Sequence, residues 1–253
     1  MAFTKAAVLI EASDVKGQLP IPGARMDVDH WNRYLRSNIG GVWSQIDIGR
    51  KPPKKDLVAR LRALSLLNDY VFVAFSGHGY HDAATDRTVV LLNDTEEMEV
   101  TEFQPPCRST VVVDACRGVE TGFALRAESV RLTALSAMNE SVKKAAFPQP
   151  TARDYALLFE QAVMRESGAG ILYSCSVGEA ADEDPNSGGV YTAALIGVAV
   201  TWHNGNQSLT PSLLSTSQAH ASAKVLLAAR RADQVPQAFF GGSSRNFPFA
   251  VRP

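Results

Sequence analysis

Residues 70–76 (YVFVAFS) and 109–115 (STVVVDA) decide the fold, because both are continuous runs made mainly of β-branched and aromatic residues. Residues 171–175 (ILYSC) form a third run of this kind. A strand with one face in water alternates apolar and polar residues, whereas a continuous run indicates a strand covered on both faces. The three runs therefore predict a largely parallel sheet that is sandwiched by helices.

The rest of the chain alternates between strand and helix patterns. We predict strands at 6–12 and 42–48, a helix that opens at Pro53, and further helices at 25–38, 153–167, 190–203 and 211–231. This order is typical of an open α/β fold. We expect a single domain over residues 1–253, a three-layer α/β/α sandwich whose mostly parallel central sheet has about six strands.

The composition is that of an ordinary folded protein with little net charge. Lys and Arg number 25 against 26 Asp and Glu, so the chain gives no support for a nucleic-acid or membrane partner, which would favour a basic surface. The longest apolar stretch, residues 190–202, is shorter than the roughly 20 residues of a bilayer span. Three cysteines suit a reducing compartment and we find no signal peptide, so we expect a cytoplasmic protein.

A histidine and a cysteine follow the two strongest predicted strands. Residues 76–79 read SGHG and residues 114–118 read DACRG, so His78 and Cys116 emerge where ligands bind in open α/β sheets, at the carboxyl ends of the strands. On neighbouring strands, an imidazole would lie close enough to a thiol to take its proton. Gly79 allows a close approach of the backbone, and N–H groups beside the pair could stabilise an oxyanion.

Each of these features alone is also common in proteins without this chemistry, since a cysteine at a strand end is usually a core residue and Gly-His-Gly can be a simple turn. Together they resemble the caspase-like cysteine peptidases, which include caspases, metacaspases and bacterial relatives. Residues 76–79 match the His-Gly motif of that family. Residues 114–118 match the caspase Gln-Ala-Cys-Arg-Gly box at four of five positions, and the departure, Asp for Gln, is shared with metacaspases.

The resemblance extends over nearly the whole chain. Residues 173–178 (YSCSVG) resemble the next family strand and its substrate-binding loop, residues 189–195 (GVYTAAL) resemble a helix start, and residues 234–237 (QVPQ) resemble the approach to the last strand. The resemblance implies a caspase-like sandwich and a thiol protease with a Cys-His dyad that hydrolyses peptide bonds through a thioester.

The resemblance also implies roles for individual residues. His78 would be the general base, Cys116 the nucleophile, and the backbone of Gly79 and Cys116 the oxyanion hole, while Ser174 would belong to the substrate-binding region. The family needs no organic cofactor. Some metacaspases require calcium, but this sequence has no EF-hand loop, so we assign no metal site.

Acidic residues near the nucleophile bear on the P1 residue, the one before the cleaved bond. Asp114 lies two positions before Cys116, so on a strand both side chains point the same way. Residues 176–184 (SVGEAADED) carry four acids and no base, among which we select Glu179 and Asp182. Acids at the pocket would repel an acidic P1 side chain and hold Arg or Lys. Alternatively, Asp114 caps backbone N–H groups and the acidic loop faces solvent.

Residues 117–152 are long for a connection and rich in Arg and Lys. In caspases the corresponding region is a cleavable linker, so we predict a mobile or cleavable linker here. If the enzyme cleaves after basic residues, it could cut itself, for instance after Arg126, Arg131 or Lys144. A solvated charged insertion is the alternative.

Several functions fit a chain with these features. The first is a cysteine endopeptidase that acts on protein substrates, with P1 Arg or Lys, and is activated by self-cleavage or a protein partner. By analogy with compact bacterial members of the family, it could act in antiviral defence. The second is a catalytically silent caspase-like scaffold or interaction module, and the third is another α/β hydrolase or transferase that uses the same dyad.

Overall fold

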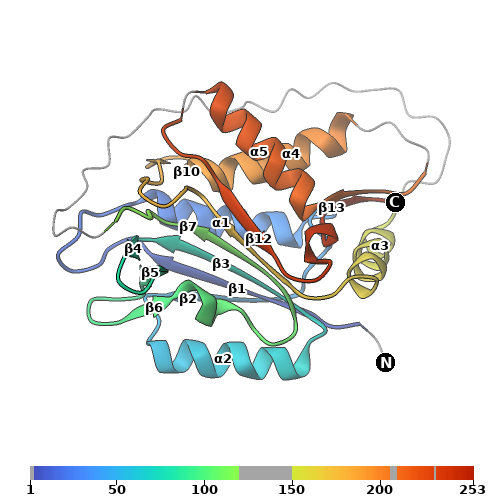
Figure 1. Cartoon of the computed structure of the whole chain (residues 1–253). Coiled ribbons are helices and arrows are strands. Elements are labelled where there is room, and N and C mark those ends of the chain that lie inside the picture. Colours follow the sequence, from blue (N-terminus) through green and yellow to red (C-terminus); the bar gives the residue numbers. More distant parts are fainter. Residues whose placement is uncertain (1–2, 120–149, 206–209, 231) are drawn as a thin grey trace.

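A six-stranded sheet with the order β12-β8-β7-β3-β1-β2 forms the centre of the protein (Figure 1). The structure is a computed structural model that describes residues 3–119, 150–205, 210–230 and 232–253. Every neighbouring pair is parallel except β12 with β8, so the predicted mostly parallel sheet is confirmed. The strands are β1 (Lys5–Ala12), β2 (Gln45–Arg50), β3 (Tyr70–Gly77), β7 (Arg108–Asp114), β8 (Ala169–Tyr173) and β12 (Gln237–Phe240).

Helices cover both faces of this sheet, as the sandwich prediction requires. One face packs against the helices α1 (Gly23–Arg36), α3 (Ala152–Met164), α4 (Val190–Gly205) and α5 (Thr216–Ala229). The other face packs against α2 (Lys54–Leu67), the 3-10 helix η1 (Val100–Phe103) and the small sheet of β4 (Gly79–Asp82), β5 (Arg87–Leu91) and β6 (Glu97–Glu99). In Figure 1, α2 lies below the central sheet and α4 and α5 lie above it.

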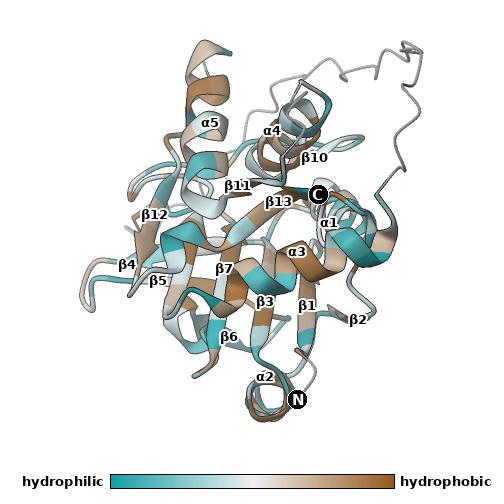
Figure 2. Ribbon diagram, turned by 90° about the vertical axis from the view of Figure 1, so that its right-hand side faces the viewer, coloured by the Kyte–Doolittle hydropathy of each residue, from teal (hydrophilic) through white to brown (hydrophobic). Residues whose placement is uncertain are grey.

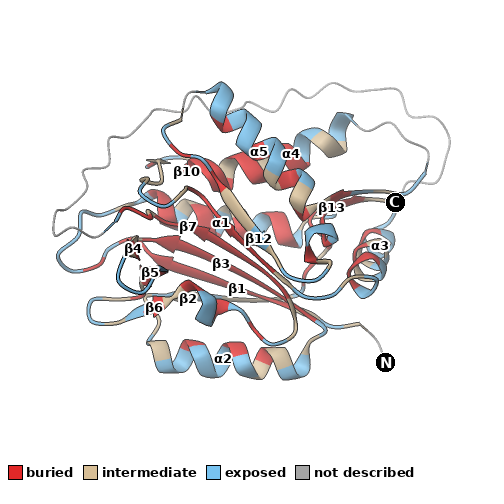
Figure 3. Ribbon diagram, in the orientation of Figure 1, coloured by how far each residue is buried: buried red, intermediate tan, exposed pale blue. Residues whose placement is uncertain are grey.

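The central strands are apolar on both sides because each side faces its own core. On β1, Ala7 and Leu9 pack against the face with four helices, whereas Val8 and Ile10 pack toward α2. Figure 2 shows much of β1, β3 and β7 as hydrophobic, and Figure 3 shows these three strands almost entirely buried. A fully buried aliphatic side chain contributes about 1.5–3 kcal/mol, so these strands hold the layers together.

Two predicted boundaries are wrong for local reasons. The strand expected at 42–48 begins later, at Gln45, because Val42 has a positive φ of 57° and Trp43 turns into the core. The helix expected from residue 211 begins at Thr216. Residues before it form β11 (Ser212–Ser215), which pairs with β13 (Pro248–Arg252), and Ser215 caps the helix by accepting a hydrogen bond from the Gln218 N–H.

The first residues of the predicted linker at 117–152 are packed within the fold. Arg117 is only 5% exposed, and the His81 N–H donates to the Gly118 carbonyl, so the chain is still packed at these positions. At the other end, α3 already starts at Ala152. Residues 120–149, with the three proposed cleavage positions, lie outside the described residues. None of the helices in the described ranges is long and apolar enough to cross a membrane.

Shortening a side chain between the layers should destabilise the protein. Leu172 on β8 is fully buried in the core that faces α1 and α4, so Leu172→Ala should lower the free energy of unfolding by about 2–5 kcal/mol. Urea denaturation measures this change. The control Leu67→Ala, at a side chain that is 70% exposed, should change stability by less than about 0.5 kcal/mol. Equal losses in the two variants would contradict the assigned core.

Candidate active site

The register of β3 with β7 brings the predicted dyad to one place. Ser76 pairs with Asp114 at the carboxyl ends of these strands, and His78 and Cys116 each follow two residues later. Beyond the strands the two segments stay side by side, because His81 bridges to Val119 in parallel. His78 and Cys116 therefore lie level with each other on adjacent segments, at the edge where ligands bind in α/β sheets.

His78 is held in one tautomer by the loop that follows β1. Its Nε2 lies 2.9 Å from the carbonyl oxygen of Leu19. A carbonyl oxygen only accepts hydrogen bonds, so Nε2 carries the hydrogen and the lone pair of the neutral ring is on Nδ1. Burial lowers the pKa of His78, and the hydrogen bond to Leu19 opposes this. The Leu19 carbonyl thus orients the ring and leaves Nδ1 free to accept a proton.

The surroundings of Cys116 raise the pKa of its thiol. Its Sγ accepts a hydrogen bond from the Ala181 N–H at 3.3 Å. Burial raises the pKa of Cys116, and the negative charges of Asp114, Asp182 and Glu183 raise it further. These shifts favour the neutral form of the Cys116 thiol over the thiolate.

Gly79 lies against the nucleophile's backbone. A Cβ at this position would be 3.0 Å from the Cys116 carbonyl oxygen, so only glycine allows this approach without displacement. The Leu91 N–H donates to the His78 carbonyl, which makes that pair a bonded pair of the antiparallel β4–β5 ladder. The next residue, Gly79, therefore points its N–H away from β5, toward the segment that follows β7.

Two buried carboxylates, Asp114 and Asp27, lie at the strand ends just before the dyad residues. Asp114 Oδ2 accepts hydrogen bonds from the N–H of Thr192 at 3.0 Å and from its hydroxyl at 2.8 Å. Asp27, from α1, accepts from the Ser76 hydroxyl at 2.5 Å and from the Gly189 N–H at 2.7 Å. A Cβ on Gly189 would collide with Asp114 Oδ2 and lie 2.9 Å from Asp27 Oδ2, so both carboxylates occupy the space where a side chain of this residue would lie.

This pair is electrostatically strained. Burial raises the pKa of both Asp27 and Asp114, and the charge of Asp114 adds to the effect on Asp27. Among the described residues, no Lys or Arg forms an ion pair with either carboxylate. Buried acids are normally paired with cations or neutralised, so this site favours a proton or an incoming cation.

Comparisons with known proteins identify the family and the fold. The sequence profile of the caspase domain matches residues 4–247. The chain belongs to the caspase-domain peptidase family. No curated protein matches it. Among solved structures, it is similar to caspase-1 from Spodoptera frugiperda, with 12% identity, a TM-score of 0.59, and coverage of 94% of this chain and 88% of that one. This likeness shows a caspase-like fold.

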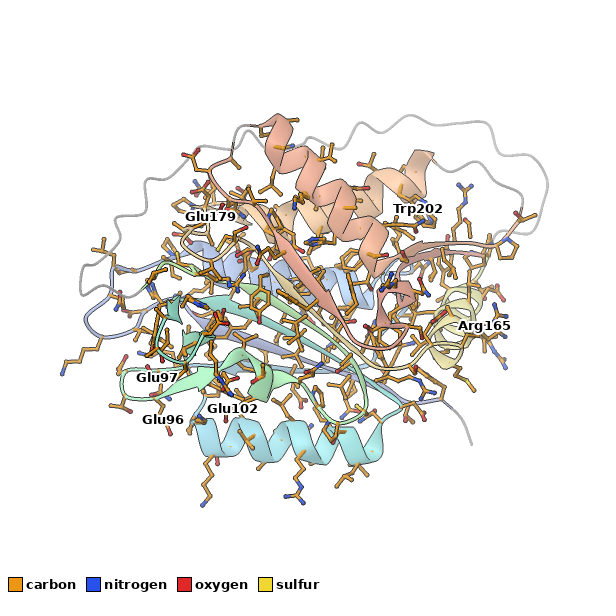
Figure 4. All side chains as sticks on the ribbon, viewed as in Figure 1. Glu96, Glu97, Glu102, Arg165, Glu179 and Trp202 are labelled. Carbon is orange, nitrogen blue, oxygen red and sulfur yellow. The ribbon has the colours of Figure 1, made fainter. Side chains whose placement is uncertain are left out.

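The other predicted substrate-binding residues of this caspase domain, Ser174, Glu179 and Asp182, each have their own surroundings. The Ser174 hydroxyl bonds both the N–H and the carbonyl of Ala115, so it ties the end of β8 to the end of β7. Glu179 accepts from the Ser176 and Val235 N–H groups, so its carboxylate orders the loop (Figure 4). Asp182 lies beside Ala181, close to the nucleophile, and burial raises its pKa.

Sequence reasoning missed Asp27, Ser76 and the Leu19 carbonyl. Asp27 lies on the α1 face that buries Trp31 and Tyr34, so an acid within an apolar helical stripe was the available signal. Ser76 precedes His78 by two residues, as Asp114 precedes Cys116, so the same strand alternation could have identified it. The Leu19 carbonyl had no signal in the sequence, because any residue type supplies one.

Arg117 holds the loops around the nucleophile together. Its guanidinium donates to the Thr88 hydroxyl, the Cys175 carbonyl and the Gln237 side chain, and it stacks 4.1 Å from the Tyr173 ring centroid. Its backbone also pairs with the loop that contains Glu179. The planar guanidinium of Arg117, the residue that follows Cys116, thus connects β5, β8 and β12. The shape of arginine suits this role.

Replacing Arg117 by lysine should damage this connection while keeping the charge. We expect Arg117→Lys to lower the free energy of unfolding by about 1–3 kcal/mol, because several buried acceptors lose their donor. Urea denaturation and hydrogen exchange of residues 174–181 measure the loss. Arg165→Lys, at an exposed arginine labelled in Figure 4, is the control and should change neither. Unchanged exchange in Arg117→Lys would refute the anchoring role.

Proposed function

We propose that this caspase-domain protein is a cysteine endopeptidase that cleaves peptide bonds after Arg or Lys through a His78–Cys116 dyad. The observation that carries the proposal is the position of two buried carboxylates: Asp114 ends the strand that precedes Cys116, and Asp27 of α1 accepts a hydrogen bond from Ser76 on the strand that precedes His78. A pocket that stores negative charge beside a nucleophile suits a cationic P1 side chain.

The first half-reaction follows from the tautomer of His78. The Cys116 S–H proton passes to Nδ1 as Sγ attacks the carbonyl carbon of the scissile bond. The negative charge that develops on the carbonyl oxygen is stabilised by backbone N–H groups, for which Gly79 and Cys116 are our candidates. When the tetrahedral species collapses, the C–N bond breaks, the departing amine takes the proton from His78, and a thioester remains on Sγ.

The second half-reaction uses the same groups in reverse. His78 takes a proton from water, the resulting hydroxide attacks the thioester carbon, and the C–S bond breaks with return of the proton to Sγ. The Leu19 carbonyl stabilises the imidazolium that exists transiently in both halves, because it accepts a hydrogen bond from Nε2–H. The proposed chemistry requires no organic cofactor and no metal ligand.

Discrimination among P1 residues would come from charge. An Asp or Glu side chain would bring a further negative charge next to Asp27 and Asp114, whereas a guanidinium can bond both carboxylates with its planar fork. Hydrogen bonds from Ser76, Thr192 and Gly189 hold the two carboxylates in fixed positions. Such fixed acceptors favour Arg over the point charge of Lys.

The proposal includes the wider biology that the family resemblance suggests. The substrate is a protein, and activation occurs through self-cleavage in the segment around 120–149 or through a protein partner. We also propose a role in defence against viruses, which rests on the resemblance to compact bacterial members of the family.

The first test compares peptide substrates that differ only at P1. Fluorogenic peptides ending in Arg or Lys should be cleaved, with kcat/KM at least about 1,000-fold above that of the Asp peptide. The reason is that Asp27 and Asp114, which have no cationic partner among the described residues, repel an acidic P1 side chain. Cys116→Ala and His78→Ala should lose turnover. Cys107→Ala, at a half-buried cysteine away from the dyad, should keep it.

Two results would decide against this proposal. Preferential cleavage after Asp would refute the pocket assignment, and absence of both turnover and labelling of Cys116 by an arginine-based thiol-reactive probe would favour a silent scaffold. The same proteins test self-processing by intact mass spectrometry. Fragments should form in the wild type and not in Cys116→Ala, and equal masses after long incubation would reject self-cleavage.

The second test removes charge from the pocket without changing its shape. Asp114→Asn keeps an oxygen that can accept from Thr192, yet it should lower kcat/KM for Arg peptides by about a hundredfold. Above neutral pH the variant should be at least as stable as the wild type, because a buried carboxyl with a raised pKa costs stability once it ionises.

The matched control is Asp47→Asn, which removes a surface carboxylate that pairs with Arg60. It should leave the cleavage of Arg peptides unchanged. Thermal melting between pH 6 and pH 9 measures the stability difference for both variants. Loss of stability in Asp114→Asn throughout this range, together with unchanged cleavage of Arg peptides, would show that Asp114 is only a structural cap.

A further inference from the structure

Glu183 lies opposite Gly189, the glycine against which both buried carboxylates pack. It belongs to the short strand β9 (Glu183–Asp184), which pairs with β10 (Gly188–Gly189) so that Glu183 is opposite Gly189. Gly189 donates its N–H to Asp27 and lies against Asp114. Of the acids in residues 176–184, Glu183 is thus placed by strand pairing next to both carboxylates, although the sequence favoured Glu179 and Asp182.

The carboxylate of Glu183 reaches the start of α1. A Cβ on Gly23 would collide with its Oε2, so the carboxylate rests against this glycine and accepts from its N–H. Burial raises the pKa of Glu183 to about 7, and the charge of Asp114 adds to this effect. Glu183 in turn raises the pKa of Asp27, so the three acids share one electrostatic environment. Within the described ranges, no Lys or Arg is ion-paired with Glu183.

The same strand also leads to the nucleophile. Ala181, two residues before Glu183, donates its N–H to Cys116 Sγ. The titratable groups that interact electrostatically with the thiol are Asp114 on β7, Cys175 after β8, and Asp182 and Glu183 around β9, while His78 follows β3 level with Cys116 in the register. The carboxylates among them all oppose the formation of a thiolate, because like charges repel. The charges that suit a cationic side chain are therefore the charges that keep the thiol protonated.

We propose that Glu183 is a third carboxylate of the P1 pocket and links it to the nucleophile, so that a cation bound by Glu183 and Asp114 releases the Cys116 proton to His78. This inference rests on the proposed function of the site. A bound guanidinium cancels part of the negative field at Sγ, and the proton then moves to Nδ1 with the S–H electron pair left on sulfur. A peptide with the correct P1 residue would thereby activate the group that attacks it, and specificity would appear in kcat as well as in KM.

Alkylation of Cys116 tests this link without catalysis. Iodoacetamide reacts with the thiolate, so the rate of carbamidomethylation at Cys116, followed by peptide mass mapping, reports ionisation of the thiol. Methylguanidinium is small enough to enter the pocket without carrying a scissile bond, and methylurea is its neutral counterpart. At pH 7 and constant ionic strength, methylguanidinium should accelerate alkylation of wild-type Cys116 by about five- to tenfold, and methylurea should not.

The variant Glu183→Gln separates charge from structure. Glutamine keeps an oxygen that accepts from the Gly23 N–H, so the start of α1 should stay intact. Alkylation of Cys116 in this variant should be faster than in the wild type without any cation and should respond less to methylguanidinium. For Arg peptides, KM should rise while kcat at pH 7 is maintained. The control Asp56→Asn, at an exposed acid on α2 across the sheet, should behave as the wild type.

The outcomes distinguish this inference from the proposed function. If methylguanidinium leaves alkylation unchanged while Arg peptides are still preferred and still depend on Asp114, the link through Glu183 is overturned and the P1 assignment stands. If Glu183→Gln responds to methylguanidinium as the wild type does, Glu183 has no part in the coupling. If Arg peptides are not preferred at all, the proposed function and the inference fall together.

Discussion

The parallel pairing of β3 with β7 is the constraint on which the candidate site depends. It sets Ser76 opposite Asp114 and therefore, two residues on, His78 level with Cys116. Because side chains alternate along a strand, the pocket residues and the dyad residues of each segment share a direction. A slip of one residue would exchange the faces of the strand and separate the carboxylates from the thiol. The apolar residues on both faces fix this register through two cores at once.

Such a site is costly for the fold. Asp27 and Asp114 are buried among apolar layers, and burial raises the pKa of each. A carboxyl group with a raised pKa in the folded state binds its proton more tightly than in the unfolded chain. Its contribution therefore lowers stability as the pH rises from the unfolded to the folded pKa. The packing of Trp31, Phe72 and Phe249 around α1 offsets this loss, and α1 can then present an acid from its buried face.

The sequence predicted the central sheet because short, continuous runs of β-branched and aromatic residues strongly favour strands that are covered on both faces. It predicted His78 and Cys116 because they follow two such runs. It did not predict the small sheet of β4, β5 and β6, whose strands are short and carry charged residues such as Arg87 and Glu99. Among the acids of residues 176–184 it selected Glu179 and Asp182, without the pairing of β9 with β10 that places Glu183 opposite Gly189. Spacing along a loop cannot show which carboxylate accepts hydrogen bonds from backbone N–H groups. That depends on how the loop folds and on how β9 and β10 pair.

In the proposed enzyme, the neutral dyad and the acidic pocket are two aspects of one charge distribution. A positively charged pocket beside Cys116 would stabilise the thiolate but reject cationic substrates, whereas the proposed acidic pocket would attract cations, and its charges raise the pKa of the thiol. An unpaired thiolate would react with any electrophile, so a protonated thiol protects the protein between substrates. Binding energy from the P1 side chain can then be used to relieve the repulsion at Sγ as the transition state forms. Interactions of this kind favour the transition state over the bound ground state, and for that reason they accelerate the reaction.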